Sequence, residues 1–237
     1  MIYAGIVAGG SGTRLKSAPV PKQFLTIGEV PIIIRTVKVF CSVSEVDKII
    51  IGIKPDWADI TGELLDRYGI DRQRVLIVNG GENRNSTVLN IAAFIKEKFG
   101  ITEADMILTH DAVRPFVDER IIRDNITTAM RDGLCGTYIT SADTVVASQS
   151  GVYVDKTLDR RTLYQAQTPQ TFPLDRLYEE LSVLSAEELD NLTDTCSVFT
   201  RKGERIRMVC GSKLNFKITS KDDLTLADAL AQQMQEI

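Results

Sequence analysis

Short apolar runs and helically spaced apolar residues alternate along most of the chain. Runs rich in Val and Ile, typical of buried strands, occupy residues 2–7, 48–53, 75–78 and 106–109. Apolar residues spaced three and four apart predict helices over 32–40, 58–68, 119–132 and from the loop at 79–87 to about residue 98. Such alternation is typical of βαβ units, so we expect an α/β fold with a mostly parallel sheet flanked by helices.

The pattern changes in the second half of the chain. A strand is predicted over 136–141, and residues 143–154 predict a β-hairpin around a polar turn. A hairpin inserted in an α/β chain exposes its edges unless something covers them. Further on, residues 185–188 have the pattern of a capping box, and Ser220 with Asp223 predicts the start of a final helix.

Composition and charge exclude several classes of protein. The 237 residues are 43% hydrophobic and 25% charged, which is ordinary for a globular protein. The net charge of -4 and the pI near 5.2 argue against a broad nucleic-acid surface. No apolar run approaches the ~20 residues of a membrane helix. We therefore expect a cytoplasmic protein without nucleic-acid or membrane partners.

Cysteine and histidine content limits the possible chemistry. The four cysteines are widely separated and form no C-x-x-C pair, so we expect buried reduced thiols rather than a disulfide scaffold or zinc site. His110 is the single histidine, which leaves almost no room for a histidine-based metal cluster. A serine triad would also depend on it, and the chain has no G-x-S-x-G motif.

A glycine-rich segment, AGGSGTR at residues 8–14, follows the first predicted strand. It is not a P-loop, because Thr13 and Arg14 follow Gly12 where Lys and Ser or Thr would be needed. It is not a dinucleotide fingerprint either, because that motif would need a glycine at position 15, which is Leu15. Its backbone N–H groups, Arg14 and the nearby Lys22 could instead clamp a triphosphate. The alternative is a mobile surface turn with two solvated cations.

Two further loops follow predicted strands, where ligands sit in parallel sheets. Residues 79–87 combine two glycines, small polar side chains and a helix start, which suits a polar ring or an anion. The alternative is an ordinary turn with Asn85 or Ser86 as the helix N-cap. Asp111 lies just after the strand predicted at 106–109 and is a candidate Mg²⁺ ligand, the alternative being a cap or an ion pair with Arg114. His110 is expected to be a packed neighbour.

The segment 8–14 together with Pro21-Lys22-Gln23 resembles the signature of nucleotidyltransferases that activate sugars and polyol phosphates. The Pro-Lys-Gln form resembles the cytidylyltransferase branch, which acts on ribitol 5-phosphate or 2-C-methyl-D-erythritol 4-phosphate. The resemblance runs from residue 1 to about 231 and includes the Gly-Gly-x-x-Arg and Thr-Pro-Gln segments at 80–84 and 168–170. It implies one Rossmann-like nucleotidyltransferase domain over 1–237, with a β-hairpin arm at about 142–158 that embraces a second subunit of a homodimer.

The resemblance also implies roles for individual residues. Catalysis would depend on Arg14, Lys22, Arg160 and Lys217. CTP would contact Val7, Ala8, Gly9, Gly10, Gly81, Glu82, Arg84 and Thr87. The acceptor would contact Arg114, Thr144, Arg160, Thr168 and Lys217. The cofactor would be Mg²⁺, bound by Asp111.

These roles predict transfer of CMP from Mg-CTP to a polyol phosphate with release of pyrophosphate. Residues 109–116, 21–25, 56–57 and 84–85 resemble the ribitol branch, so we expect ribitol 5-phosphate as acceptor and CDP-ribitol for a teichoic-acid-like wall polymer as product. Residues 157–160 instead resemble the isoprenoid branch, which uses 2-C-methyl-D-erythritol 4-phosphate. The sequence leaves open two less favoured functions, a sugar-1-phosphate nucleotidyltransferase that uses another NTP and a catalytically silent nucleotide-binding protein.

Overall fold

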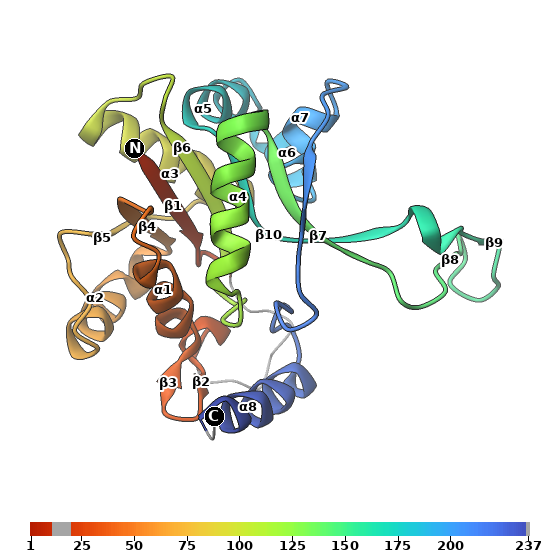
Figure 1. Ribbon diagram of the computed structural model, residues 1–237, viewed down its shortest axis with the longest axis horizontal. Coiled ribbons are helices and arrows are strands. Elements are labelled where there is room, and N and C mark those ends of the chain that lie inside the picture. Colours follow the sequence, from red (N-terminus) through yellow and green to blue (C-terminus); the bar gives the residue numbers. More distant parts are fainter. Residues whose placement is uncertain (11–19, 236–237) are drawn as a thin grey trace.

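Seven strands form one central sheet in the computed structural model, which describes residues 1–10 and 20–235 (Figure 1). Their order across the sheet is β11-β7-β10-β6-β1-β4-β5. All neighbouring strands are parallel except β10, which runs antiparallel to both β6 and β7. The predicted mostly parallel α/β fold is therefore confirmed. The strands are β1 Ile2–Val7, β4 Lys48–Ile53, β5 Val75–Asn79, β6 Met106–Asp111, β7 Cys135–Thr140, β10 Tyr164–Pro173 and β11 Arg207–Cys210.

Helices cover both faces of this sheet. Side chains alternate between the faces along each strand, so in β4 Ile49 and Ile51 enter one hydrophobic cluster and Ile50 enters the other. The first cluster includes α1 Ile32–Ser42, α2 Ala58–Arg67 and α4 Glu119–Asp132. The second includes α3 Arg84–Phe99, α5 Leu174–Ser182, α6 Ala186–Asn191 and α7 Ser197–Thr200. In the described ranges, no helix has the length and apolar character needed to cross a membrane.

Three helix starts were predicted from capping patterns, and two of them are confirmed. Ser185 and Glu188 form a reciprocal capping box at α6, and Ser220 and Asp223 do the same at α8 Lys221–Gln235. At α3 the predicted N-cap was wrong. Asn83 is the cap, because its side chain accepts the Ser86 N–H at 2.8 Å while the Ser86 hydroxyl accepts the Asn83 N–H at 2.9 Å.

The C-terminal helix α8 lies against a small hairpin near the start of the chain. This hairpin pairs β2 Thr26–Ile27 with β3 Val30–Pro31 and follows the 3₁₀ turn η1 Lys22–Phe24. The Gly28 N–H donates to Asp228 of α8 at 2.8 Å. The apolar residues beneath them join this hairpin to the C-terminal segment and include Ile27, Ile32, Val113, Ile218 and Ala227.

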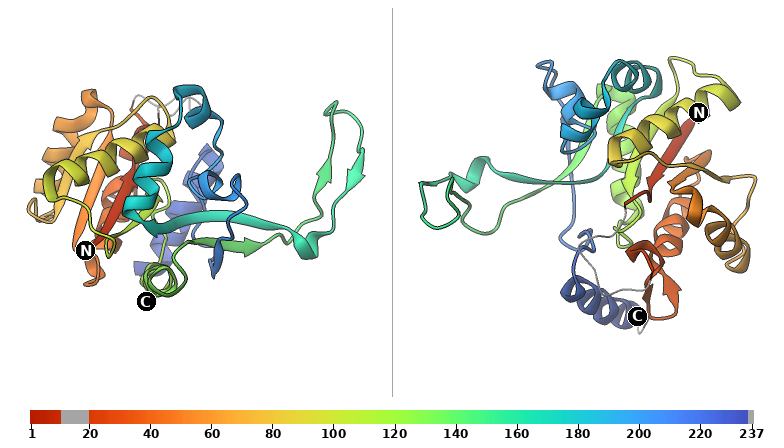
Figure 2. Two further views of the ribbon diagram at one scale, coloured as in Figure 1. Left: turned by 90° about the horizontal axis from the view of Figure 1, so that it is seen from above. Right: turned by 180° about the vertical axis from the view of Figure 1, so that it is seen from behind.

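A β-hairpin extends away from the body of the molecule between β7 and β10 (Figures 1 and 2). Its strands, β8 Val146–Ala147 and β9 Lys156–Thr157, are antiparallel, which agrees with the hairpin expected in this region. They are short, and the connection between them is longer than the sequence predicts. Val152, Tyr153 and Val154 in this connection are 74, 76 and 63% exposed, so the tip presents apolar surface without a covering partner in the described chain. The 3₁₀ turns η2 Pro55–Trp57 and η3 Arg160–Thr162 complete the fold.

Candidate functional site

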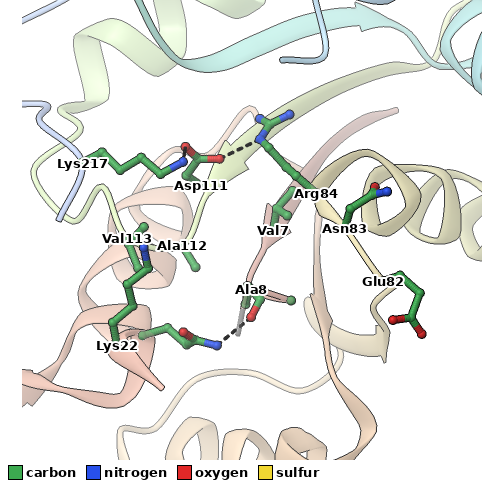
Figure 3. A pocket seen from close by; sticks show the side chains of 13 residues that line it. Val7, Ala8, Lys22, Glu82, Asn83, Arg84, Asp111, Ala112, Val113 and Lys217 are labelled. Atoms are coloured by element: carbon green, nitrogen blue, oxygen red, sulfur yellow. Dashed lines mark hydrogen bonds and ion pairs between the residues drawn. The ribbon is translucent and has the colours of Figure 1, made fainter. Parts of the chain in front are cut away.

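A pocket of about 190 Å³ lies at the carboxyl ends of β1 and β6, where ligands bind in open α/β sheets (Figure 3). Several predicted residues line it together: Val7, Ala8, Gly9, Gly10, Lys22, Glu82, Arg84, Asp111 and Lys217. Gln23, Asn83, Ala112 and Val113 complete the lining without having been predicted. The sequence analysis therefore located most of this pocket, which we call the nucleotide pocket after the CTP contacts that the resemblance implies for these residues. Arg14 lies outside the described residues.

Close packing explains the small residues at 8–10, which form what we call the first wall of the nucleotide pocket. A Cβ on Gly9 would lie 2.9 Å from the Thr87 hydroxyl, so only glycine allows the strand end to lie this close to α3. Thr87 itself is fully buried, accepts the Gly81 N–H at 3.0 Å and donates to the Asn83 carbonyl at 2.8 Å. The structure therefore places Thr87 and Gly81 behind the pocket surface, where they hold the loop, although both were predicted to contact CTP.

The wall carrying Lys22 is tied directly to the glycine segment. The side-chain amide of Gln23 is buried and donates to the Ala8 carbonyl at 2.7 Å. Next to it, Phe24 stacks on Trp57 with ring centroids 5.0 Å apart. These two contacts hold the 3₁₀ turn η1 against the body of the protein and orient Lys22 toward the pocket. The Pro-Lys-Gln motif thus supplies both a pocket cation and its anchor.

Asp111 is the centre of a buried charge cluster in the nucleotide pocket. Its Oδ1 accepts from Arg84 Nε at 2.9 Å, and its Oδ2 lies 3.0 Å from Lys217 Nζ and 3.5 Å from Arg114 Nε. Figure 3 shows Arg84 and Lys217 approaching the carboxylate from opposite sides. Burial alone would raise the pKa of Asp111, but the three cations outweigh it and hold this pKa well below its usual range.

The charge balance of this cluster suits an anion. One carboxylate faces three cations, so the group carries a net positive charge inside the pocket. Burial lowers the pKa of Arg114, and the adjacent Asp111 carboxylate partly offsets that effect. Among the described residues, Arg84 Nη2 is buried and has no hydrogen-bond partner. A buried donor without a partner is costly unless a ligand supplies the acceptor.

Residues that the sequence analysis missed hold these cations in place. Arg84 Nη1 donates to the Thr195 hydroxyl at 2.6 Å, across 111 positions of sequence. Arg114 Nη1 donates to the Asn215 carbonyl at 2.9 Å, and Asn215 Nδ2 donates to the Thr168 carbonyl at 2.8 Å. Thr195 and Asn215 are fully buried. In the sequence, Asn215 stands two residues before Lys217, and Thr195 directly follows Thr193-Asp194. These positions are the only signals that could have drawn attention to the two residues.

The predicted acceptor residues divide into three groups. Arg114 and Lys217 lie together and also line a second pocket beside the nucleotide pocket. The Thr168 hydroxyl is buried in contact with His110 and the Asp111 N–H. Thr144 and Arg160 are exposed at the base of the hairpin, where Arg160 donates to the Ala142 carbonyl at 3.3 Å. In this single chain, the structure does not bring these two residues into the lining of either pocket.

The residues around Asp111 do not form a metal site by themselves. In residues 1–10 and 20–235 there is no group of three or more His, Cys, Asp or Glu side chains that could hold a metal ion. Both oxygens of Asp111 already contact cations. The alternative interpretation of Asp111 as an ion-pair partner of Arg114 therefore agrees with the structure. Mg²⁺ commonly takes one or two protein carboxylates and completes its shell with substrate phosphates and water, so Asp111 can serve only as one ligand of a metal that arrives with a triphosphate.

Solved structures of known enzymes share this architecture over nearly the whole chain. A 4-diphosphocytidyl-2C-methyl-D-erythritol synthase from Anaerococcus prevotii is 29% identical, with a TM-score of 0.80 over 98% of this chain and 96% of that one. The 2-C-methyl-D-erythritol 4-phosphate cytidylyltransferase of Francisella tularensis is 28% identical, with a TM-score of 0.80 over 96% of this chain and 98% of that one. The corresponding enzyme of Thermus thermophilus, at 23% identity and a TM-score of 0.74, covers 98% of this chain and 100% of that chain and shows the same fold.

A family model gives the same result from sequence. The model described as IspD, 2-C-methyl-D-erythritol 4-phosphate cytidylyltransferase, matches residues 2–233. This confirms the cytidylyltransferase resemblance of the glycine segment and the Pro-Lys-Gln motif, and with it a nucleotidyltransferase that uses CTP. It does not separate the two acceptors considered above. With its mostly parallel sheet, its nucleotide pocket and this match, the chain belongs to the IspD family of cytidylyltransferases.

Proposed function

We propose that this cytidylyltransferase transfers CMP from CTP to the phosphate group of a polyol phosphate and releases pyrophosphate. The observation that carries the proposal is the cluster of Arg84, Arg114 and Lys217 around Asp111. Lys217 lines both the nucleotide pocket and the second pocket. A cation at this junction can contact phosphates of both substrates, as a reaction between two anions requires.

The reaction needs positioning and charge rather than a covalent intermediate. An oxygen of the acceptor phosphate attacks the α-phosphorus of CTP, and the bond from that phosphorus to the bridging oxygen of pyrophosphate breaks. Negative charge then moves onto the departing pyrophosphate. We assign its stabilisation to Lys22, which lines the nucleotide pocket together with Ala8, Gly9 and Gly10, and to Arg14, which follows these residues in the sequence. Lys217 and Arg114 hold the attacking phosphate.

The nucleotide itself would lie between the first wall and the start of α3. Glu82 and Arg84 line this side of the pocket, and Arg84 Nη2 is a buried donor that a nucleotide could satisfy. Gly9 and Gly10 leave the backbone accessible beside it. Mg²⁺ would enter as Mg-CTP, with Asp111 as one of its ligands. Pyrophosphate release that continues at full rate in excess EDTA would contradict this requirement.

Two acceptors remain candidates. The description of the family model and the names of the similar solved structures favour 2-C-methyl-D-erythritol 4-phosphate. Ribitol 5-phosphate, which the sequence analysis preferred, is the second candidate because of residues 109–116, where Val113 lines the nucleotide pocket next to Asp111. Identities of 29% and 28% to the two enzymes named first above support the family more strongly than they support either acceptor. Both acceptors present a phosphate to Lys217 and Arg114.

We also infer a homodimer formed through the hairpin. The exposed Val152, Tyr153 and Val154 at its tip are the kind of apolar surface that a partner subunit covers. Within residues 1–10 and 20–235, the two short strands of the hairpin pair only with each other. A second copy of the chain is the natural partner, since most oligomers of soluble proteins are homo-oligomers with closed symmetry.

Pyrophosphate release with separate nucleotides and acceptors tests the proposed function. Release is expected to be faster with CTP than with UTP, ATP or GTP. Each of the two polyol phosphates is assayed side by side with a control that contains no acceptor. Release that requires CTP and a polyol phosphate supports the proposal. Faster release with UTP or ATP and a sugar 1-phosphate would replace it with the sugar-nucleotidyltransferase function. Absence of turnover with intact CTP binding would support a catalytically silent nucleotide-binding protein.

A further inference from the structure

Gln170, the last residue of the Thr-Pro-Gln segment, has no role in the proposed reaction. It lies in β10 and is 1% exposed. Three residues earlier in the same strand, Gln167 holds the segment that leads to Lys217. The Gln167 Nε2 donates to the Ser212 carbonyl at 2.8 Å, and its Oε1 accepts the Ser212 N–H at 3.3 Å. Gln170 uses its side-chain amide in a similar way on a different segment of the chain.

The side chain of Gln170 holds the segment at the start of α7. Its Oε1 accepts the N–H groups of Thr195 and Cys196 at 3.1 and 3.3 Å. Its Nε2 donates to Asp194 at 2.6 Å, and Asp194 in turn accepts the Ser197 N–H at 2.9 Å. The two N–H groups that flank the Cα of Thr195 are therefore fixed by one buried amide.

A chain of hydroxyl groups holds the Thr195 side chain as well. A guanidinium can only donate, so the Thr195 hydroxyl accepts from Arg84 Nη1, at 2.6 Å. The main-chain carbonyl of Gln170 can only accept, so it takes the proton of the Thr109 hydroxyl, at 3.3 Å. The Thr195 proton is then free for Thr109 Oγ1, 3.3 Å away. The chain thus begins at Arg84 and ends at Gln170, the residue that also fixes the Thr195 backbone.

Arg84 connects this network to the nucleotide pocket, which its side chain lines. Its Nε is held by Asp111 at 2.9 Å and its Nη1 by Thr195. One hydrogen bond to Nε would leave the plane of the guanidinium free to tilt, so the second contact, to Thr195, sets its orientation. Among the residues that the structure describes, the remaining nitrogen, Nη2, has no partner and stays available to a ligand.

We propose that Gln170 and Thr195 are positioning residues for CTP binding, which hold the guanidinium of Arg84 in the orientation that meets the nucleotide. This inference deepens the proposed function and rests on its placement of CTP in the nucleotide pocket. Neither Gln170 nor Thr195 lines that pocket, so each acts through Arg84 and not by contact with CTP. Because Arg84 is oriented before the nucleotide arrives, less side-chain freedom is lost on binding.

The affinity for CTP tests this positioning role. Calorimetry with Mg²⁺ and without an acceptor gives the Kd for CTP in the absence of turnover. Thr195→Val keeps the shape of the side chain and removes its hydroxyl, and Gln170→Met removes the amide. Each is expected to raise the Kd by about 10-fold, the lower end of what one hydrogen bond to a charged group contributes. Thr195→Ser retains the hydroxyl and is expected to keep a Kd close to that of the wild type.

The same substitutions in an Arg84→Met background show whether they act through Arg84. If they do, Thr195→Val and Gln170→Met raise the Kd in the wild type and cause no further rise once Arg84 is absent. An equal rise in both backgrounds would show a role in folding alone and would overturn the inference, as would a wild-type Kd in both single variants. Circular dichroism confirms that each variant is folded, and if Thr195→Val is not, the Gln170→Met comparison decides.

Thr171→Val is the matched control. Thr171 directly follows Gln170 in β10 and is equally buried, but its hydroxyl lies 3.4 Å from Asn125 Oδ1 of α4, on the other face of the sheet. Its Kd for CTP is expected to equal that of the wild type, and a rise as large as that of Thr195→Val would overturn the inference. Pyrophosphate release is measured separately, so a wild type that binds CTP but releases none would contradict the proposed function and leave the effects on affinity intact.

Discussion

The Nδ1 atom of His110 lies 3.0 Å from the hydroxyl oxygen of Thr168, and this contact closes a chain of three hydrogen bonds. His110 Nε2 lies 3.2 Å from the Arg114 carbonyl, which can only accept, so Nε2 carries the proton. Nδ1 therefore accepts from the Thr168 hydroxyl, whose oxygen accepts the Asp111 N–H at 3.1 Å. The neutral imidazole thus joins the backbone of Asp111 to that of Arg114, two members of the charge cluster.

We expect His110→Phe and Thr168→Val each to weaken this chain. His110→Phe retains an aromatic ring against Phe40, whose centroid is 5.0 Å away, but removes the acceptor of the Thr168 hydroxyl proton and leaves the Arg114 carbonyl with only the Val117 N–H, at 3.5 Å. The free energy of unfolding should fall by about 1–3 kcal/mol, the cost of one buried hydroxyl donor without an acceptor. Urea unfolding of both single variants and the double variant measures the coupling. Additive losses would contradict a direct interaction between the two side chains.

Acid should destabilise the protein through the same histidine. Burial is the main cause that lowers the pKa of His110 from its ordinary 6.5 to about 3. Between these values the unfolded chain binds one more proton than the native state, so its free energy of unfolding falls as the pH falls through this window. The loss is at most about 1.4 kcal/mol per pH unit. Urea unfolding from pH 7 to 4 should show this slope, and His110→Phe should flatten it; equal slopes would show that other groups dominate.

Asp111→Asn should abolish activity and destabilise the fold. The side chain is 8% exposed, so the substitution leaves Arg84, Arg114 and Lys217 near one another without their counter-ion. Removing one partner of a buried ion pair typically costs about 3–5 kcal/mol. Pyrophosphate release and urea unfolding measure the two effects. Asp228→Asn, at the exposed contact with Gly28, is a matched control that should retain activity.

Lys22→Met should lower kcat much more than it raises the KM for CTP. Its charge matters most as pyrophosphate leaves, and loss of one such stabilising group typically costs ~10² to 10³ in kcat. Arg14→Met is expected to behave in the same way. Lys38→Met, an exposed lysine on α1, serves as the control. A large rise in KM with unchanged kcat would assign Lys22 to ground-state binding instead.

Tyr153→Asp should convert the proposed dimer to monomers. A carboxylate at the exposed apolar tip would have to be buried, without a counter-ion, against the partner subunit. Light scattering coupled to size exclusion gives the mass of each variant. Val183→Asp places the same charge on a valine that is 75% exposed on the body of the protein and should leave the dimer intact. A monomeric wild type would show that the hairpin has another partner.

Local sequence was enough to predict the parallel part of this fold. Strands β1, β4, β5 and β6 are short Ile- and Val-rich runs followed by periodic helices, and their side chains alternate between two hydrophobic clusters. Because parallel strands end at the same edge, the residues after β1 and at the end of β6 could be expected to share one pocket. Glycine content and the Pro-Lys-Gln motif identified the wall of that pocket, since close backbone approach limits the residues that fit.

Contacts between distant segments could not be predicted in this way. Strand β10 enters the sheet antiparallel, between two strands of the opposite direction, and its polar residues have no strand-like alternation. The pairing of Asp111 with Lys217, the anchoring of Arg84 by Thr195 and the hold of Gln167 on Ser212 each join residues at least 45 positions apart. Hydrophobic periodicity determines which face of an element is buried, whereas the partner of a buried polar group depends on how the elements pack. The sequence thus determined where the pocket lies, and only the tertiary structure decided which side chains share its charges.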